Sequence, residues 1–157
     1  MLKRNWQQYA DLVEHYHGVR LRPGEDRQLV LNIAIGDTHE RALEMARPGH
    51  DEFWRFLGPY GWSKAYADEA NQGKPWAFGR IPSLEESVAQ GAWLVGTADE
   101  LGDQVAELQH DLGLEYLSIF PHFPGMVREQ AIEQIERFSS QIKPRLLASA
   151  VPAGAGA

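Results

Sequence analysis

The sequence predicts an α/β fold whose sheet is parallel. Two short runs, residues 28–35 and 114–120, are apolar or aromatic with little polar alternation, which is typical of parallel strands buried on both faces. Segments with helical periodicity precede, separate and follow these runs. Strands that alternate with helices form a parallel sheet. Two such strands would leave their edges unpaired, so the sequence predicts only part of a larger sheet.

The first predicted helix spans residues 2–17, and Gly18 ends it. No N-cap residue precedes Leu2, so the apolar stripe is already running where the chain begins, which suggests a cut chain. The stripe follows helical spacing. It consists of Leu2, Trp6, Tyr9, Val13 and Tyr16.

A second helix is predicted directly after the first strand. Asp37 is placed to cap it, with Glu40 at the capping-box position. We expect Pro48–Gly49 to interrupt this helix and a short helix to resume over residues 50–57. We expect three basic residues of this segment to lie on a solvated helix face. Alternatively, they could contact an anionic ligand. They are Arg47, His50 and Arg55.

Residues 58–82 combine many glycines and prolines with aromatic residues. A long irregular segment in a compact domain is usually a functional loop or a linker. Solvated linkers are poor in aromatic residues, so we predict a packed lid. The whole insertion is assigned to residues 46–82. Trp62 and Trp76 lie in it and could cover a bound ligand, with lid packing as the alternative.

The next segment carries two capping boxes, Ser83 with Glu86 and Thr97 with Glu100. The first opens a short helix, residues 93–97 are predicted to form a loop, and the second opens a longer helix. This longer helix ends at Gly113.

Two features of these helices leave alternatives open. Gly102 lies inside the longer helix and indicates either close packing or simple tolerance. Gly96–Thr97 could bind a phosphate at the helix N-terminus. Simple capping is favoured, because Asp99 and Glu100 already use that positive end.

The last predicted helix runs from after Met126 to about Lys143, where Pro144 stops it. Residues 1–147 therefore form one partial domain, and residues 148–157 are a small-residue tail that we expect to be disordered. The resulting order of helices and strands is that of the last quarter of a (β/α) barrel. No internal repeat supplies the missing strands.

Composition excludes several classes of function. The net charge of −7 argues against nucleic acid and anionic membranes as partners. The absence of cysteine excludes disulfides, thiolate zinc sites and cysteine nucleophiles. No metal-binding motif occurs, and no apolar run approaches the roughly 18 residues of a membrane span. With no signal peptide at its start, the chain is expected to be cytoplasmic.

Four segments of the chain resemble the luciferase-like flavin-dependent monooxygenases. They are Asn5–Gln7, Ile35–Ala42, Leu94–Leu101 and Leu117–Met126. The similarity is to the C-terminal part of that family, in the branch with long-chain aldehyde and alkane or limonene monooxygenase-like members. It spans residues 2–147.

The resemblance implies a TIM-barrel enzyme that uses reduced FMN and O2 to oxidise an apolar organic substrate, with the deazaflavin F420 as the alternative cofactor. The two strands would be the seventh and eighth of the barrel. Gly36–Asp37 and Phe120–Phe123 would then face the active-site mouth. In that family most flavin contacts come from earlier strands, so no cofactor-binding residue is assigned in this chain.

His122 is the candidate catalytic residue. It follows a predicted buried strand, between prolines that fix the loop. It could donate a hydrogen bond to a flavin or shuttle a proton near neutral pH. The alternative is a loop histidine that packs on Phe123.

Asn32, Phe120 and Phe123 are candidates for lining a substrate pocket, together with Trp62 and Trp76 of the lid. Asn32 is a lone polar residue in a buried run and must find hydrogen bonds there, with neighbouring backbone as the alternative partner. Core packing is the alternative role of the two phenylalanines.

Two functional hypotheses follow. The first is a fragment of a flavin-dependent monooxygenase that is inactive as an isolated chain and needs the missing N-terminal half of the barrel. The second is a non-catalytic truncated protein, or an interaction module that completes the barrel of a partner through its exposed sheet edges.

Overall fold

The computed structural model describes residues 2–62 and 80–149. The predicted helix at the start of the chain is confirmed, and so are the two predicted strands, of which the second is shorter at its start. The elements in chain order are α1 (Leu2–His17), β1 (Gln28–Ile35), α2 (His39–Leu57), the 3₁₀ turn η1 (Gly58–Tyr60), α3 (Leu84–Ala89), β2 (Trp93–Gly96), α4 (Ala98–Leu112), β3 (Tyr116–Phe120), α5 (Arg128–Arg137), the π-helical turn η4 (Phe138–Ile142) and α6 (Lys143–Ser149). None of the described helices is long and apolar enough to span a membrane.

The sheet has three parallel strands in the order β2-β1-β3. The prediction of a loop at residues 93–97 is wrong, because Trp93–Gly96 forms β2 and pairs with Asn32–Ile35 of β1. All four residues of β2 are buried. Four residues are too few to give a recognisable periodic pattern in the sequence. The strand forms by pairing with the long apolar strand β1 beside it.

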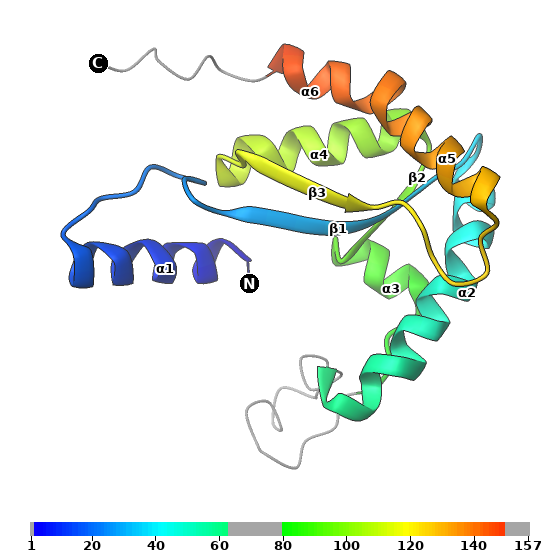
Figure 1. Ribbon diagram of the computed structural model, residues 1–157, viewed down its shortest axis with the longest axis horizontal. Helices are drawn as coiled ribbons and strands as arrows, with labels where there is room; N and C mark the ends of the chain where they lie inside the picture. Colours follow the sequence, from blue (N-terminus) through cyan, green and yellow to red (C-terminus); the bar gives the residue numbers. More distant parts are fainter. Residues whose placement is uncertain (1, 63–79, 150–157) are drawn as a thin grey trace.

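Helices cover both faces of the sheet (Figure 1). One face packs against α4, η4 and α6 through Leu31, Ile33 and Ile35. On the other face, the carboxyl-terminal half packs against α2 and α3 through Ala34, Trp93 and Val95. The sheet is therefore open. In a closed (β/α) barrel, strands that follow one another in the sequence are neighbours, whereas here β1 lies between β2 and β3.

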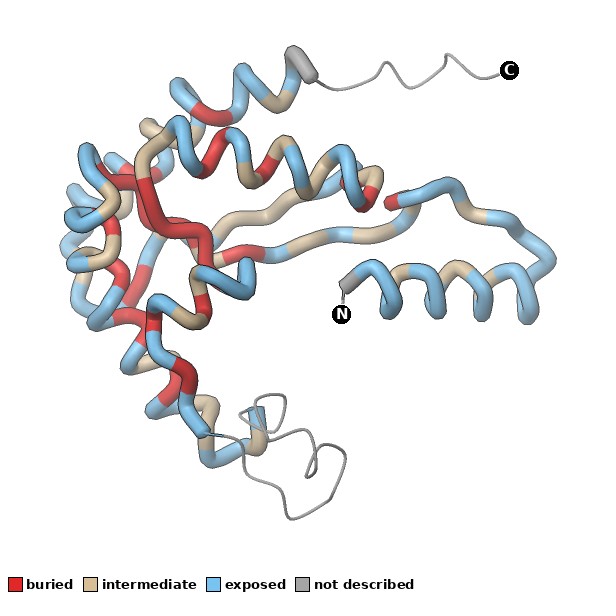
Figure 2. The backbone as a smooth tube through the Cα atoms, turned by 180° about the vertical axis from the view of Figure 1, so that it is seen from behind, coloured by how far each residue is buried: buried red, intermediate tan, exposed pale blue. Residues whose placement is uncertain are grey.

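The prediction that the second apolar run is buried on both faces is wrong. Tyr116 and Phe120 of β3 are 62% and 57% exposed, and Val30 beside them on β1 is also exposed. Figure 2 shows burial concentrated in β2 and in the carboxyl-terminal half of β1. Because β3 is an edge strand on a half-covered face, its apolar side chains reach solvent.

Helix α2 corrects two predictions. Its N-cap is Thr38, whose hydroxyl accepts a hydrogen bond from the backbone N–H of Arg41 at 3.2 Å, and Asp37 lies outside the helix. The helix also continues through Pro48–Gly49 without interruption. A Cβ added to Gly49 would lie 2.3 Å from Cβ of Phe123, so the glycine permits a close approach that holds the helix against the loop after β3.

The C-terminal helical segment corrects a third prediction, because it runs to Ser149 and does not stop at Pro144. The π-helical turn η4 precedes α6, and Pro144 is the second residue of α6. The π-helical turn shortly before the proline already departs from the regular α-helical hydrogen-bond pattern, and Pro144 follows it. The predicted tail therefore begins with two helical residues, and residues 150–157 lie outside the described residues.

Both predicted capping boxes are present, at Ser83 with Glu86 and at Thr97 with Glu100. Gly113 ends α4 in the left-handed conformation, as predicted. A Cβ on Gly102 would lie 2.6 Å from Nη1 of Arg145 in α6. The guanidinium of Arg145 thus packs over this glycine, but as the end of a flexible side chain it could move aside, so the contact does not decide between close packing and tolerance.

A buried glutamine in α5 ends the hydrogen-bond ladder of β1. The backbone N–H of Ile35 donates to Oε1 of Gln134 at 2.6 Å, and Nε2 of Gln134 donates to the carbonyl of Ile35 at 3.0 Å. β3 ends at Phe120, which pairs with Asn32, so it does not reach Ile35. The side-chain amide thus takes the place of a further residue of β3.

Replacing Gln134 by leucine removes both of these hydrogen bonds. We expect the free energy of unfolding to fall by about 2–4 kcal/mol, because two buried backbone groups lose their partners. Gln141→Leu makes the same chemical change at an exposed position and should cost less than about 1 kcal/mol. Urea denaturation of the two variants tests this, and equal losses would contradict the assigned role of Gln134.

Candidate functional site

The carboxyl ends of the strands meet at one edge of the sheet. On the face that is only half covered, Trp93, Asn32 and Phe120 lie in register across β2, β1 and β3. Trp93 is buried, Asn32 is half-buried and Phe120 is exposed. The structure therefore brings the predicted pocket residues Asn32 and Phe120 together, with the indole of Trp93 on the other side of Asn32.

Aromatic side chains extend this row away from the sheet. Phe123 is buried with its ring centroid 5.0 Å from that of Trp93. Phe53 of α2 lies 6.1 Å from Trp93 and 6.2 Å from Trp62. The predicted residues Phe123 and Trp62 thus belong to one aromatic cluster, defined as Phe53, Trp62, Trp93 and Phe123. Trp76 lies outside the described residues.

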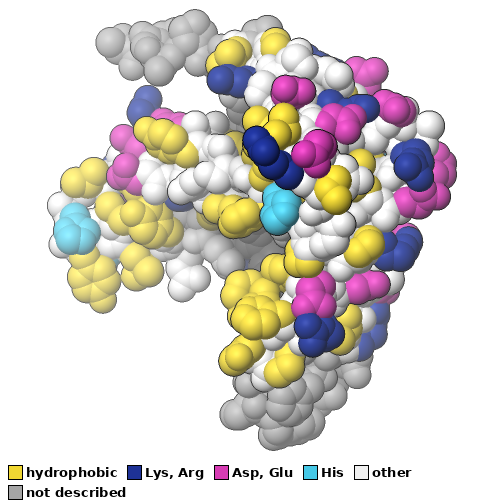
Figure 3. Space-filling view, turned by 45° about the vertical axis from the view of Figure 1, so that its right-hand side comes forward, with side chains coloured by type: hydrophobic (Ala, Val, Ile, Leu, Met, Phe, Trp, Pro, Cys, Tyr) yellow, Lys and Arg dark blue, Asp and Glu magenta, His cyan; other side chains and the backbone are white. Residues whose placement is uncertain are grey.

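His122 lies in the loop after β3 and is exposed. A turn fixes this loop, because the N–H of Met126 donates to the carbonyl of Phe123 at 3.1 Å and the N–H of Phe123 approaches Sδ of Met126 at 3.3 Å. Phe123 is therefore held inward while its neighbour His122 faces solvent. In the space-filling view, hydrophobic side chains line a hollow between the α1 and α2 lobes (Figure 3).

His50 belongs to a buried hydrogen-bond network and not to a solvated helix face, so that prediction is wrong for this residue. It is 1% exposed. Its Nε2 lies 2.9 Å from Oγ of Ser87 and accepts from Nε1 of Trp54 at 3.1 Å, and its Nδ1 lies 3.3 Å from Asp51. The ring also contacts Trp93 edge-on at 5.4 Å.

This network has the residue types of a serine nucleophile, a histidine base and an acid. Ser87 is fully buried, however, at 0% exposure, so its hydroxyl cannot reach a substrate. The network instead ties α2 to α3, next to β2. The other two basic residues are on solvated faces as predicted, since Arg47 pairs with Glu85 and Arg55 pairs with Glu52. The Arg47 hydrogen bond lowers the pKa of Glu85 to about 2.

Polar groups at the carboxyl edge are largely paired with one another. Arg137 lies 2.8 Å from both Asp37 and Glu133. His39 lies 3.3 Å from Glu100. The pKa of Glu100 is lowered, first because its carboxylate accepts the backbone N–H of Thr97 and then because of His39.

These pairs bear on anion binding at the edge. The capping box at the start of α4 uses its positive end, which agrees with the expectation of simple capping at Gly96–Thr97. Arg128 at the start of α5 is exposed and makes no ion pair within the described part of the chain. Among residues 2–62 and 80–149, no group of three or more acidic, histidine or cysteine side chains could hold a metal ion.

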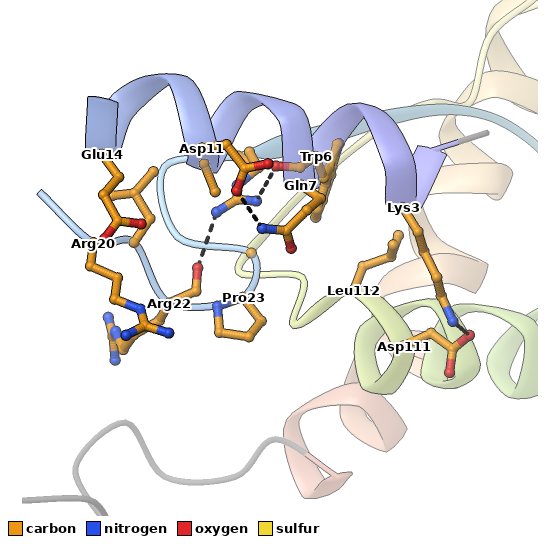
Figure 4. A pocket seen from close by; sticks show the side chains of 14 residues that line it. Lys3, Trp6, Gln7, Asp11, Glu14, Arg20, Arg22, Pro23, Asp111 and Leu112 are labelled. Atoms are coloured by element: carbon orange, nitrogen blue, oxygen red, sulfur yellow. Dashed lines mark hydrogen bonds and ion pairs between the residues drawn. The ribbon is translucent and has the colours of Figure 1, made fainter. Parts of the chain in front are cut away.

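A pocket lies at the other end of the sheet (Figure 4). It has a volume of about 740 Å³ between α1, the turn before β1 and the end of α4. Arg27 stacks on Trp6 and Tyr9 and donates to three backbone carbonyls, and Lys3 pairs with Asp111. Most polar groups of this pocket thus bind one another, and it is remote from His122 and Phe120.

The fold is similar to part of two solved monooxygenases. The oxygenating constituent of the 3,6-diketocamphane monooxygenase of Pseudomonas putida, a type II Baeyer–Villiger monooxygenase solved with FMN, superimposes with a TM-score of 0.63 over 92% of this chain at 18% identity. Monooxygenase RslO1 of Streptomyces bottropensis gives a TM-score of 0.64 over 90% of this chain at 16% identity.

The chain spans about two fifths of the length of these two structures, 40% and 38% respectively. No protein-family model matches the sequence. No curated protein matches it significantly either. The likeness to the two monooxygenases is therefore one of fold.

Sequence reasoning missed Trp93 as a residue of the site region and placed His50 on a solvated face, although it is buried. Trp93 opens an apolar quartet between Gly91 and Thr97, and these punctuating residues are the signal that could have identified a short strand. His50 gave no signal, because its burial depends on Ser87, which is 37 residues away.

Adding a methyl group at Gly49 tests how the His122 loop is held. Gly49→Ala places a Cβ 2.3 Å from Cβ of Phe123, so we expect a loss of about 1–3 kcal/mol of stability and a displaced loop. Gly58→Ala is the matched control, because nothing lies within 4 Å of its Cβ. Denaturation and the NMR chemical shifts of the His122 ring provide the readouts. Unchanged His122 shifts in Gly49→Ala would exclude this contact as the loop's anchor.

Proposed function

We propose that this chain is the C-terminal part of a luciferase-like flavin-dependent monooxygenase. The observation that carries the proposal is the match of fold over at least 90% of the chain to two monooxygenases, one of them solved with FMN. The four resembling sequence segments support it independently. The complete barrel, with residues 46–82 as its lid, and a cytoplasmic location are parts of this proposal.

The substrate side of the site would be an apolar wall. Asn32, Phe120 and the aromatic cluster meet at the carboxyl end of the sheet, the end at which barrel enzymes carry out chemistry. The exposed ring of Phe120 would contact an apolar organic substrate. The side-chain amide of Asn32 makes no hydrogen bond to another described residue, and it would orient a polar group of that substrate.

Reduced FMN would supply the oxygen-activating chemistry, with F420 as the alternative. The apolar wall suits a flavin ring, but the described residues fit its phosphate poorly. The helix N-termini of α2 and α4 are capped by their own side chains, and Arg137 is neutralised by two carboxylates. Arg128 at the start of α5 is the cation at this edge that could contact a phosphate, and the other phosphate-binding groups would come from outside the described part of this chain.

The isolated chain is accordingly expected to bind FMN weakly, with a dissociation constant above about 1 µM, which corresponds to about 8 kcal/mol. Quenching of flavin fluorescence on titration with the chain measures this constant. Riboflavin, which lacks the phosphate, is the matched ligand and should bind about equally well. Submicromolar binding that requires the phosphate would overturn the assignment of the phosphate site to other residues.

His122 is proposed to assist the reaction by positioning or transferring a proton at the substrate or flavin. The test uses the chain co-produced with the part of a structural neighbour that this chain does not cover. Turnover is measured as the oxidation of apolar ketones and aldehydes with reduced FMN and O2. We expect His122→Ala to lower kcat about 10²-fold or more.

His110→Ala is the control, because His110 is an exposed histidine of α4 remote from the carboxyl edge. Equal rates for the two variants would remove His122 from the proposal. An assembly that binds FMN but oxidises no substrate would instead favour the second candidate function, a non-catalytic module that completes a partner's barrel. The observation in favour of that candidate is the open sheet.

A further inference from the structure

The loop after β3 contains a tight turn whose shape is fixed by its own sequence. The turn spans Phe123 to Met126, and the backbone N–H of Met126 donates to the carbonyl of Phe123 at 3.1 Å. A type II turn favours proline at its second position and requires a positive φ, usually that of glycine, at its third. Pro124 and Gly125 occupy these positions, and Gly125 has a φ of 94°. The turn therefore brings Met126 back beside Phe123.

The sulfur of Met126 closes the same turn through its side chain. The backbone N–H of Phe123 donates to Sδ of Met126 at 3.3 Å. The two residues are thus joined by two hydrogen bonds that run in opposite directions. A backbone N–H of a buried residue needs an acceptor. Here that acceptor is a thioether, which is a group that oxidants convert to a sulfoxide.

Phe123 connects this turn to the core. Its ring centroid lies 5.0 Å from that of Trp93 in β2. Its Cβ lies so close to α2 that only a glycine fits opposite, at Gly49. Met126 packs against the same apolar cluster as Phe123 and Trp93. The thioether therefore helps to hold the residue that fastens the loop, and with it the neighbouring His122, to α2 and β2.

The two described methionines differ in what their sulfur atoms do. Met126 is half-buried, so a small oxidant can reach it. Met45 in α2 is also half-buried, but its sulfur accepts no hydrogen bond within residues 2–62 and 80–149. Oxidation of Met126 should therefore disturb a specific contact, whereas oxidation of Met45 should not.

Hydrogen peroxide is the oxidant that we consider. One of its oxygen atoms forms a bond to the sulfur while the O–O bond breaks. The sulfur is oxidised by two electrons, and the peroxide is reduced to water. The product is a polar, chiral sulfoxide, and it has two epimers because either lone pair of the sulfur can take the oxygen.

Both epimers weaken the contact with Phe123. An oxygen on the lone pair that faces the N–H would have to fit within the 3.3 Å between nitrogen and sulfur, although an N–H···O hydrogen bond alone needs about 2.9 Å. An oxygen on the other lone pair leaves an electron-poor sulfur, whose remaining lone pair is a weaker acceptor. It also places a polar group beside an apolar cluster.

We propose that Met126 is a peroxide-sensitive modification site, and that its oxidation to the sulfoxide releases the loop that carries His122 from α2 and β2. Methionine sulfoxide is reversible by methionine sulfoxide reductases, so the turn works as a redox switch at the carboxyl edge of the sheet. This inference does not rest on the proposed function, because neither a flavin nor a substrate takes part in it.

Peroxide titration of the chain tests the proposal. Mass spectrometry of proteolytic peptides locates the sulfoxide, while the NMR shifts of the His122 ring and urea unfolding are followed at the same time points. We expect the His122 resonances to move, and the unfolding equilibrium constant to rise about 5- to 30-fold, in proportion to oxidation at Met126. The two methionine sulfoxide reductases, one for each epimer, should restore both properties.

Two leucine variants separate the described methionines. Met126→Leu approximately keeps the side-chain volume and removes the sulfur, so its His122 shifts and its unfolding should not respond to peroxide. Met45→Leu is the matched control. It retains Met126 and should respond as the unmodified chain does. Met1 is present in both variants and cannot cause a difference between them.

Three results would overturn the proposal. The first is complete oxidation of Met126 with unchanged His122 shifts and unchanged unfolding. The second is a response of Met126→Leu equal to that of Met45→Leu. The third is a Met126 that stays reduced while Met45 is oxidised. The first and third results come from the unmodified chain, so they do not depend on the folding of either variant.

Discussion

The paired hydrogen bonds between Gln134 and Ile35 control how the carboxyl edge is built. A longer β3 would satisfy Ile35 in the ordinary way, but it would carry the chain straight past the end of β1. With the amide in that position, β3 stops at Phe120 and the chain is free to turn toward α2. The same contact fixes α5 against the sheet. The loop that bears His122 therefore exists because a side chain replaces a strand residue.

The two faces of the sheet then have different roles. One is sealed along its length by α4, η4 and α6. The other is sealed only near the carboxyl ends, by α2, α3 and the aromatic cluster, and leaves Val30 and Tyr116 exposed. Exposed apolar surface on a sheet normally marks contact with a ligand or another chain. The open half of this face is thus the surface that the proposed substrate would contact.

Sequence reasoning was accurate where structure is local. β1, α1 and both capping boxes follow from patterns within a few residues, and all were predicted. It failed where distant contacts decide the outcome. Pro48 stays inside α2, where the adjacent Gly49 packs on the distant Phe123, and β2 forms because β1 lies beside it. Asn32, Phe120 and Phe123 could be placed near the site because they lie on strands or just after one, whereas Trp93 could not.

Two histidines compete for a chemical role, and their environments separate them. His50 has a serine and an acid as partners, but at 1% exposure it and Ser87 can touch only the protein itself. His122 has no described hydrogen-bond partner, yet it is exposed at the carboxyl edge beside the apolar row. A proton can be transferred to a substrate only by a group within hydrogen-bond reach of it. Access therefore outweighs the resemblance of the His50 network to a catalytic triad. His50 contacts Trp93, and Trp93 contacts Phe123, the sequence neighbour of His122.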